Sequence, residues 1–120
     1  MKRILLVEDD RNIRELLRQE LHDDGYLITT ASNGKEALTA LKNKDQEKPD
    51  LIILDLRMPK MDGLETMGHI LKSKNETPVI IHTAYAGYKD DALAMAADAF
   101  VVKSHDLTEL KGVILELIGK

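Results

Sequence analysis

The chain has 120 residues, a formal net charge of −4 at pH 7, 43% hydrophobic residues and 32% charged residues. This length and composition indicate a single globular domain, because disordered chains are poorer in apolar residues. The absence of cysteine excludes a disulfide framework and a thiolate metal site. The negative charge disfavours direct nucleic-acid binding, since neutralising phosphates requires a basic surface.

The N-terminus gives no sign of export or membrane insertion. Its apolar run spans only Ile4 to Val7, which is too short for a signal-peptide core or a membrane span. We therefore expect a cytoplasmic protein that does not contact membranes. The chain ends soon after its last helical pattern, so residues 1–120 are expected to form one domain, with a stand-alone protein favoured over a fragment.

Short apolar runs without polar alternation predict four strands that are buried on both faces, as in parallel sheets. These runs are ILLV (4–7), LIIL (51–54), VII (79–81) and FVV (100–102). A fifth run, LITTA (27–31), alternates between apolar and polar residues and is typical of an edge strand.

Apolar residues at helical spacing predict a helix after each strand. The predicted helices are 11–23, 35–44, 64–74, 88–97 and 107–118. Asp10 and Asp106 precede the first and last of them as candidate N-caps. Gly25 follows the first helix as a stop signal.

Five alternating strands and helices predict an α/β fold with a parallel sheet covered by helices on both sides. In 120 residues this fits a flavodoxin-like (βα)5 doubly wound sandwich, with a five-stranded sheet of order 2-1-3-4-5. Ligands in such sheets bind outside the carboxyl ends of the strands, where the strand order reverses. The residues that directly follow the strands are therefore the candidate site.

Charged and hydroxyl residues follow four of the predicted strands. Glu8 and Asp9 follow the first strand, Asp55 the third, Thr83 the fourth and Lys103 the fifth. Carboxylates clustered without histidine or thiolate suit a hard cation, Mg²⁺ before Zn²⁺. A cation, a lysine and a hydroxyl together can hold phosphoryl oxygens, and an aspartate among them can be the nucleophile that forms an aspartyl-phosphate.

These residues resemble the receiver domain of bacterial two-component response regulators, of the stand-alone, chemotaxis-regulator-like type. The resemblance covers the whole chain and rests on four motifs in the right order at the right strand ends. They are VEDD (7–10), LDLRMPKMDG (54–63), HTAY (82–85) and AADAFVVKS (96–104).

The resemblance implies a role for each residue at the strand ends. Asp55 would accept a phosphoryl group from a phosphohistidine of a sensor histidine kinase. Glu8, Asp9 and Asp55, together with the backbone carbonyl of Arg57, would bind Mg²⁺ or Mn²⁺, with Asp9 a more direct ligand than Glu8.

Three more residues would bind or sense the phosphoryl group. Thr83 and Lys103 would each bind a phosphoryl oxygen, and Phe100 is at the position of the family's switch aromatic. In the family, the side chains two positions past the aspartate and two past the threonine tune phosphate lifetime, which here are Arg57 and Tyr85. Both are large, so we expect slow dephosphorylation.

The sequence departs from the family pattern at two positions. Ser104 stands where the family usually has proline after the lysine, with a cis bond before it; for serine a cis bond costs about 3–4 kcal/mol, which favours trans. Ala96 stands where the family often has glycine. Both changes bear on the surface formed by the fourth helix and fifth strand, and not on phosphorylation.

Other residues receive a structural interpretation. Pro59 is expected to fix the turn after the acceptor, and Gly63 is interpreted as an ordinary loop residue. His82 is expected in the core or behind the site. Ile13 is either a core residue or part of a kinase-docking surface.

The resemblance implies a phosphorylation-dependent signalling protein rather than an enzyme. Its expected partners are a sensor kinase and a downstream phosphotransfer or effector protein. Two alternatives within this class are a phosphorelay intermediate and an excised receiver domain of a larger transcriptional regulator. Outside this class, a flavin-binding domain is disfavoured, because this chain has the acidic VEDD where a phosphate-binding loop would be needed and has few aromatic residues. An aspartate-dependent phosphatase is disfavoured as well, because it would need a carboxylate where Arg57 stands. A receiver that is never phosphorylated is disfavoured by the intact set of strand-end residues.

Overall fold

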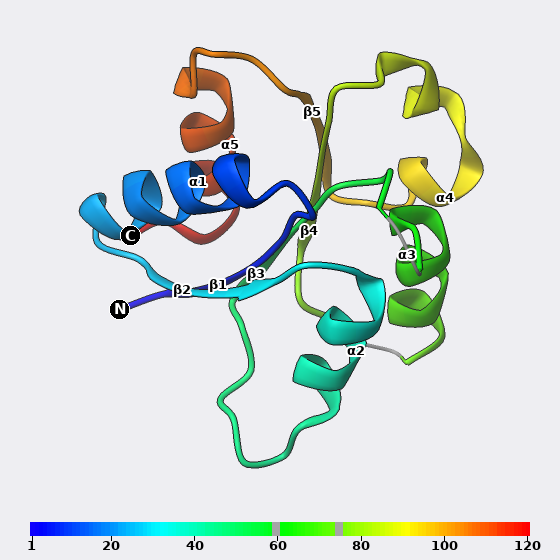
Figure 1. The fold of residues 1–120 in the computed structure, drawn as a ribbon, viewed down its shortest axis with the longest axis horizontal. Coiled ribbons are helices and arrows are strands. Elements are labelled where there is room, and N and C mark those ends of the chain that lie inside the picture. Colours follow the sequence, from blue (N-terminus) through cyan, green and yellow to red (C-terminus); the bar gives the residue numbers. More distant parts are fainter. Residues whose placement is uncertain (59–60, 74–75) are drawn as a thin grey trace.

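A computed structural model describes residues 1–58, 61–73 and 76–120. Within them the chain forms a five-stranded parallel sheet of order β2-β1-β3-β4-β5, which confirms the predicted topology (Figure 1). The strands are β1 (Arg3–Val7), β2 (Leu27–Ala31), β3 (Leu51–Leu54), β4 (Val79–Thr83) and β5 (Ala99–Val102).

Helices follow each strand, as predicted, with one difference near β4. The helices are α1 (Arg11–Asp23), α2 (Gly34–Lys42), α3 (Gly63–Lys72), α4 (Ala92–Met95) and α5 (Thr108–Ile118), with a 3-10 helix, η1 (Ala86–Asp90), before α4. None of the described helices has the length and apolar character needed to cross a bilayer.

The prediction of one continuous helix over 88–97 was wrong. Asp91 has extended backbone angles (φ −70°, ψ 136°) between η1 and α4, and its carboxylate accepts a hydrogen bond from the Leu93 N–H. This residue therefore ends η1 and caps a new helix. Only Ala94 of α4 is buried, so little packing energy opposes the break.

The other helix boundaries follow their sequence signals. The Asp10 carboxylate accepts hydrogen bonds from the N–H groups of Asn12 and Ile13, and Gly25 follows α1 with a φ of +99°. The Asp106 carboxylate accepts from the Thr108 N–H at 2.9 Å. Asp106 therefore binds the first N–H of α5 but is not the N-cap residue that the sequence predicts, because Leu107 occupies that position and the helix begins one residue later than predicted.

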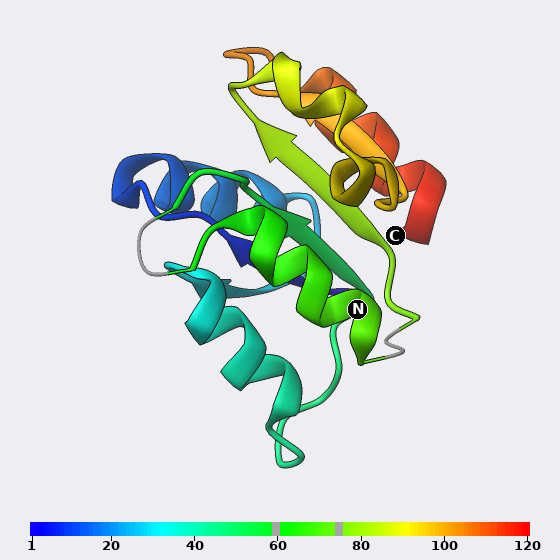
Figure 2. The same ribbon diagram turned by 90° about the vertical axis from the view of Figure 1, so that its right-hand side faces the viewer.

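Helices cover both faces of the sheet, which explains the unbroken apolar strands. Leu17 of α1 and Ile114 of α5 pack on one face together with Ile4 of β1. Met67 of α3 packs on the opposite face together with Leu5 of β1. Figures 1 and 2 show α2 and α3 side by side on this second face. Neighbouring strand residues thus enter different core layers, and both must be apolar.

Gly63 permits α3 to begin directly against the loop that follows β3. Its N–H donates to the carbonyl oxygen of Leu56 at 2.7 Å. A Cβ at this position would overlap the Asp55 carbonyl oxygen and the Leu56 backbone. The interpretation of Gly63 as an ordinary loop residue was therefore incomplete, because the position requires glycine for close backbone approach. Pro59, which the sequence predicts to fix a turn, lies outside the described residues.

We expect Gly63→Ala to lower the free energy of unfolding by about 1–3 kcal/mol, because a methyl group would be forced into the Asp55–Leu56 backbone. Gly68→Ala in the same helix is the matched control. No heavy atom lies near its added Cβ, and alanine should stabilise the helix by up to about 1 kcal/mol. Urea denaturation of the two variants measures both effects. A Gly63→Ala protein as stable as wild type would contradict the packing argument.

Candidate functional site

The carboxyl ends of the central strands meet at one edge of the sheet. Val7 of β1 is in register with Leu54 of β3, and the Asp55 N–H donates to the Val7 carbonyl at 3.1 Å. At the same edge, between β4 and β5, the Lys103 N–H donates to the Thr83 carbonyl at 2.8 Å. The residues that follow β1, β3, β4 and β5 are thus fixed relative to one another by the sheet itself.

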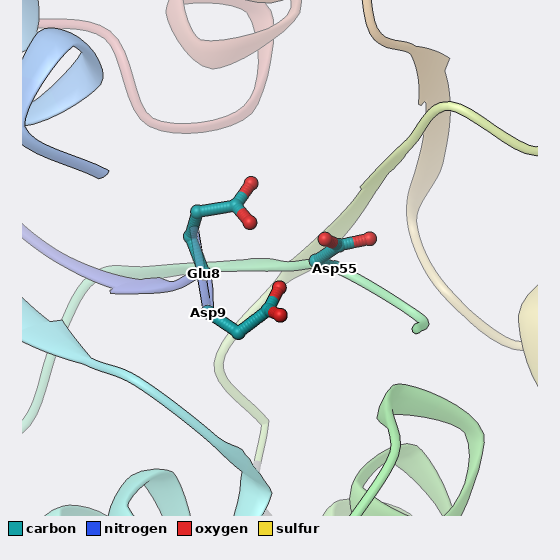
Figure 3. A group of neighbouring side chains, drawn as sticks. All are labelled: Glu8, Asp9 and Asp55. Carbon is teal, nitrogen blue, oxygen red and sulfur yellow. The ribbon is translucent and has the colours of Figure 1, made fainter. Parts of the chain in front are cut away.

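Three carboxylates gather at this edge. Oxygen atoms of Glu8, Asp9 and Asp55 all lie within 4.8 Å of one another, and Figure 3 shows them at the ends of β1 and β3. Glu8 and Asp55 are buried, with 1% and 5% of their surface exposed, whereas Asp9 is exposed. The cluster therefore opens to solvent on the side of Asp9.

Lys103 bridges the two buried carboxylates. Its Nζ lies 2.6 Å from a Glu8 carboxylate oxygen and 2.9 Å from an Asp55 carboxylate oxygen. One ammonium group cannot offset all of the negative charge that three carboxylates can carry. The peptide bond after Lys103 is trans, as expected from Ser104, because the described residues contain no cis peptide bond.

The Asp55 carboxylate is held in one orientation. Its Oδ2 accepts a hydrogen bond from Lys103 Nζ, and its Oδ1 accepts one from the Leu56 N–H at 2.7 Å. Both oxygens of this buried carboxylate thus accept hydrogen bonds, which fixes the orientation of the Asp55 side chain.

Burial and charge shift the pKa values of neighbouring groups in different directions. Burial raises the pKa of Glu8 from 4.5 to about 7, and the nearby Asp55 charge adds to this rise although Lys103 opposes it. Burial lowers the pKa of Lys103, but its hydrogen bonds to Glu8 and Asp55 outweigh this and raise the pKa overall. Burial, with the Lys103 charge, lowers the pKa of His82 to about 4. Lys103 is thus charged and His82 neutral at pH 7.

The oxygen cluster fits a hard divalent cation. Three carboxylates around one point, with one of them open to solvent, match the ligands that Mg²⁺ and Mn²⁺ prefer. The excess negative charge at the same edge favours a cation of charge two there.

Thr83 and Phe100 are two further residues that the sequence assigned to the site. Thr83 is fully buried, and its hydroxyl oxygen accepts from the Tyr85 N–H at 3.2 Å. Among the described residues, no hydrogen bond joins Thr83 to Asp55. Phe100 is half-buried and packs against the core layer that contains Leu54 and Ile81.

Arg57 and Tyr85 stack on each other between the loops that follow β3 and β4. The guanidinium carbon of Arg57 lies 4.6 Å from the centroid of the Tyr85 ring, within the range of a cation–π contact. Tyr85 in turn contacts Tyr88 of η1 edge-on, with ring centroids 6.4 Å apart. These contacts connect the loops that follow β3 and β4.

Comparison with known proteins matches this arrangement to one family. The family model of the response regulator receiver domain matches residues 4–115. The chain belongs to this family. Its receiver fold and the order of its strand-end residues therefore agree with the resemblance read from the sequence.

A curated relative is a longer protein. The alkaline phosphatase synthesis transcriptional regulatory protein PhoP of Bacillus subtilis is 35% identical over 121 residues, which is 99% of this receiver chain and 49% of PhoP. The chain spans about half the length of the first curated relatives that it matches.

Solved structures of a response regulator protein have a higher sequence identity to this chain. Response regulator protein TrrA of Thermotoga maritima, in complex with Mg(2+)-BeF, has 48% sequence identity and a TM-score of 0.89, covering 98% of this chain and 100% of that chain. The structure of TrrA in complex with histidine kinase ThkA has the same sequence identity and a TM-score of 0.87. The match covers 98% of this chain and 99% of that chain.

Sequence reasoning missed two residues that shape the receiver site. Gly63 was interpreted only as a loop residue, because the sequence pattern does not show that the chain folds back here against the Asp55–Leu56 backbone. Arg14, whose side chain binds the loop that carries Glu8 and Asp9, was not singled out. Its position one turn inside the helix that follows the acidic run is a signal that was available.

Proposed function

We propose that this receiver domain, residues 1–120, is a phosphorylation-dependent signalling switch that accepts a phosphoryl group on Asp55 from a phosphohistidine of a sensor histidine kinase. The observation that carries the proposal is the buried Asp55 carboxylate, held by Lys103 and the Leu56 N–H beside two further acids. The protein acts on itself as a phosphoacceptor and does not turn over a separate substrate.

In the proposed reaction an Asp55 carboxylate oxygen attacks the phosphorus, and the P–N bond of phosphohistidine breaks with its electron pair going to the ring nitrogen. The histidine leaves as neutral imidazole because its other ring nitrogen carries a proton in the reacting form. Lys103, already 2.9 Å from Asp55, would bind one phosphoryl oxygen. The Thr83 hydroxyl would turn from the Tyr85 N–H to donate to another. Each interaction stabilises charge that the transferring group carries.

Glu8, Asp9, Asp55 and the backbone carbonyl of Arg57 are the proposed ligands of Mg²⁺ or Mn²⁺. The bound cation supplies charge neutralisation for the phosphoryl oxygens during transfer. The proximity of the three carboxylates supports this assignment. The TrrA structure with Mg(2+)-BeF supports it as well, since that relative has 48% sequence identity.

The proposed output is a packing change. Movement of Thr83 toward the phosphoryl group would free space at the end of β4, and Phe100, now half-buried, would turn inward. The phosphoryl group then biases an equilibrium between two arrangements of the surface around β5. A downstream effector or phosphotransfer protein would read that surface in the cytoplasm.

A sensor histidine kinase is the proposed phosphodonor. The structure of TrrA with histidine kinase ThkA supports this choice. Exposed Leu16 on α1 and partly buried Ile13 beside it give an apolar surface near the site. Ile13 thus packs against the core with one part of its side chain and contributes another part to this surface.

A second role is favoured by the length of the curated relatives. Because the chain spans 49% of PhoP, which is a transcriptional regulatory protein, this sequence also suits the receiver part of a larger regulator. A phosphorelay intermediate is the remaining form of the same chemistry.

The acceptor assignment predicts one covalent phosphoryl group per chain. Incubation with Mg²⁺ and acetyl phosphate should add the mass of one phosphoryl group to wild type and to the control Asp90→Asn, an exposed aspartate in η1. Asp55→Asn should gain none, because the nucleophile is lost. Intact-protein mass spectrometry measures this. Failure to label wild type, or labelling that persists in Asp55→Asn, would overturn the proposal.

The stacked Arg57–Tyr85 pair predicts a long-lived phosphate. The two side chains would restrict the approach of water to the aspartyl-phosphate, so Arg57→Ala combined with Tyr85→Ala should shorten its half-life severalfold. Lys89→Ala, which removes an exposed side chain from η1, is the control and should leave the half-life unchanged. Loss of label with time after removal of the phosphodonor gives the half-life. An unchanged half-life in the double variant would reject this role.

A further inference from the structure

Arg14 binds the backbone of the loop that carries Glu8 and Asp9. Its Nη1 donates to the Glu8 carbonyl at 2.9 Å and to the Asp9 carbonyl at 3.3 Å. The side chain is half-buried in the first turn of α1. Both carbonyls belong to the loop between β1 and α1, and within the described part of the chain no backbone N–H donates to either of them.

Local contacts fix the rest of this loop. The Asp10 N–H donates to a Glu8 carboxylate oxygen at 3.2 Å, and the Arg14 N–H donates to the Asp10 carbonyl at 2.8 Å. The Asp10 carboxylate caps the start of α1. Arg14 therefore completes a set of contacts that orients successive peptide planes of Glu8 and Asp9.

The charge of Arg14 alone would oppose a cation at this site. A guanidinium near the carboxylates repels a divalent ion through space, so its contribution to metal binding must come from geometry. Holding the two carbonyls by one donor fixes the directions in which the Glu8 and Asp9 side chains leave the backbone. Contacts to groups behind metal ligands commonly contribute to metal affinity in this manner.

We propose that Arg14 is a positioning residue for the divalent metal site, acting by holding the Glu8 and Asp9 backbone so that their carboxylates face Asp55. This inference rests on the proposed function of that site. Its consequence is specific, since loss of positioning weakens cation binding whereas loss of a nearby positive charge strengthens it. The two effects have opposite signs and can be separated by substitution.

The experiment measures the dissociation constant for Mg²⁺ alone by calorimetric titration of the full chain. Arg14→Gln should bind Mg²⁺ about tenfold more weakly than wild type. The matched control is Arg11→Gln, which removes the same charge from the same helical turn. Arg11 is exposed and, in the described part of the chain, makes no hydrogen bond or ion pair. Arg11→Gln should bind Mg²⁺ as tightly as wild type or slightly more tightly.

Arg14→Lys provides the rescue variant, because an ammonium can still donate to one of the two carbonyls and should restore part of the affinity. Urea denaturation of every variant in EDTA measures the stability of the metal-free protein. Equal stabilities would exclude partial unfolding as the cause of a weaker Mg²⁺ affinity. Equal Mg²⁺ affinity in Arg14→Gln and Arg11→Gln would overturn the role of Arg14 and leave the metal site standing. Absence of Mg²⁺ binding in wild type would instead overturn the proposed function, and the inference with it.

Discussion

The ion pair that Lys103 forms with Glu8 and Asp55 joins the ends of β5, β1 and β3, and the geometry of the site depends on it. The ammonium lies 2.6 Å and 2.9 Å from the two buried carboxylates. Removal of the Lys103 charge would leave both buried carboxylates without their ammonium partner. Because Lys103 offsets only part of the acidic charge, the folded protein keeps a residual negative charge beside Asp9. This charge favours the binding of a further cation there.

The sheet makes this interaction possible. Parallel strands buried on both faces deliver their carboxyl ends to one edge, so residues distant in sequence become neighbours there. Close contacts behind the edge set its details, with Gly63 admitting α3 against the Asp55 backbone and Arg14 holding the Glu8–Asp9 loop. The core thus fixes the backbone, and the backbone fixes the directions of the acidic side chains.

Much of this could be read from the sequence because the strands are continuous apolar runs, each followed by a chemically distinctive residue. Strand order, the cap at Asp10 and the grouping of Asp55 with Glu8 and Lys103 all follow from that pattern. The helix predicted over 88–97 failed because alanines alone did not reveal that Asp91 would cap a new helix. The requirement for Gly63 and the contact of Arg14 arise from tertiary approach, which periodicity does not encode.

The central claim is that the acidic edge is a divalent cation site balanced only in part by Lys103. The most direct test is the free energy of unfolding of wild type and Asp9→Asn, measured in EDTA and in millimolar Mg²⁺. Wild type should gain stability from Mg²⁺, because only the folded state brings the carboxylates together. In EDTA, Asp9→Asn should be at least as stable as wild type, because one of the mutually repelling carboxylates is gone. It should gain little stability from Mg²⁺, because a ligand of the cation is gone as well. A wild-type unfolding free energy that is indifferent to Mg²⁺ would contradict the account.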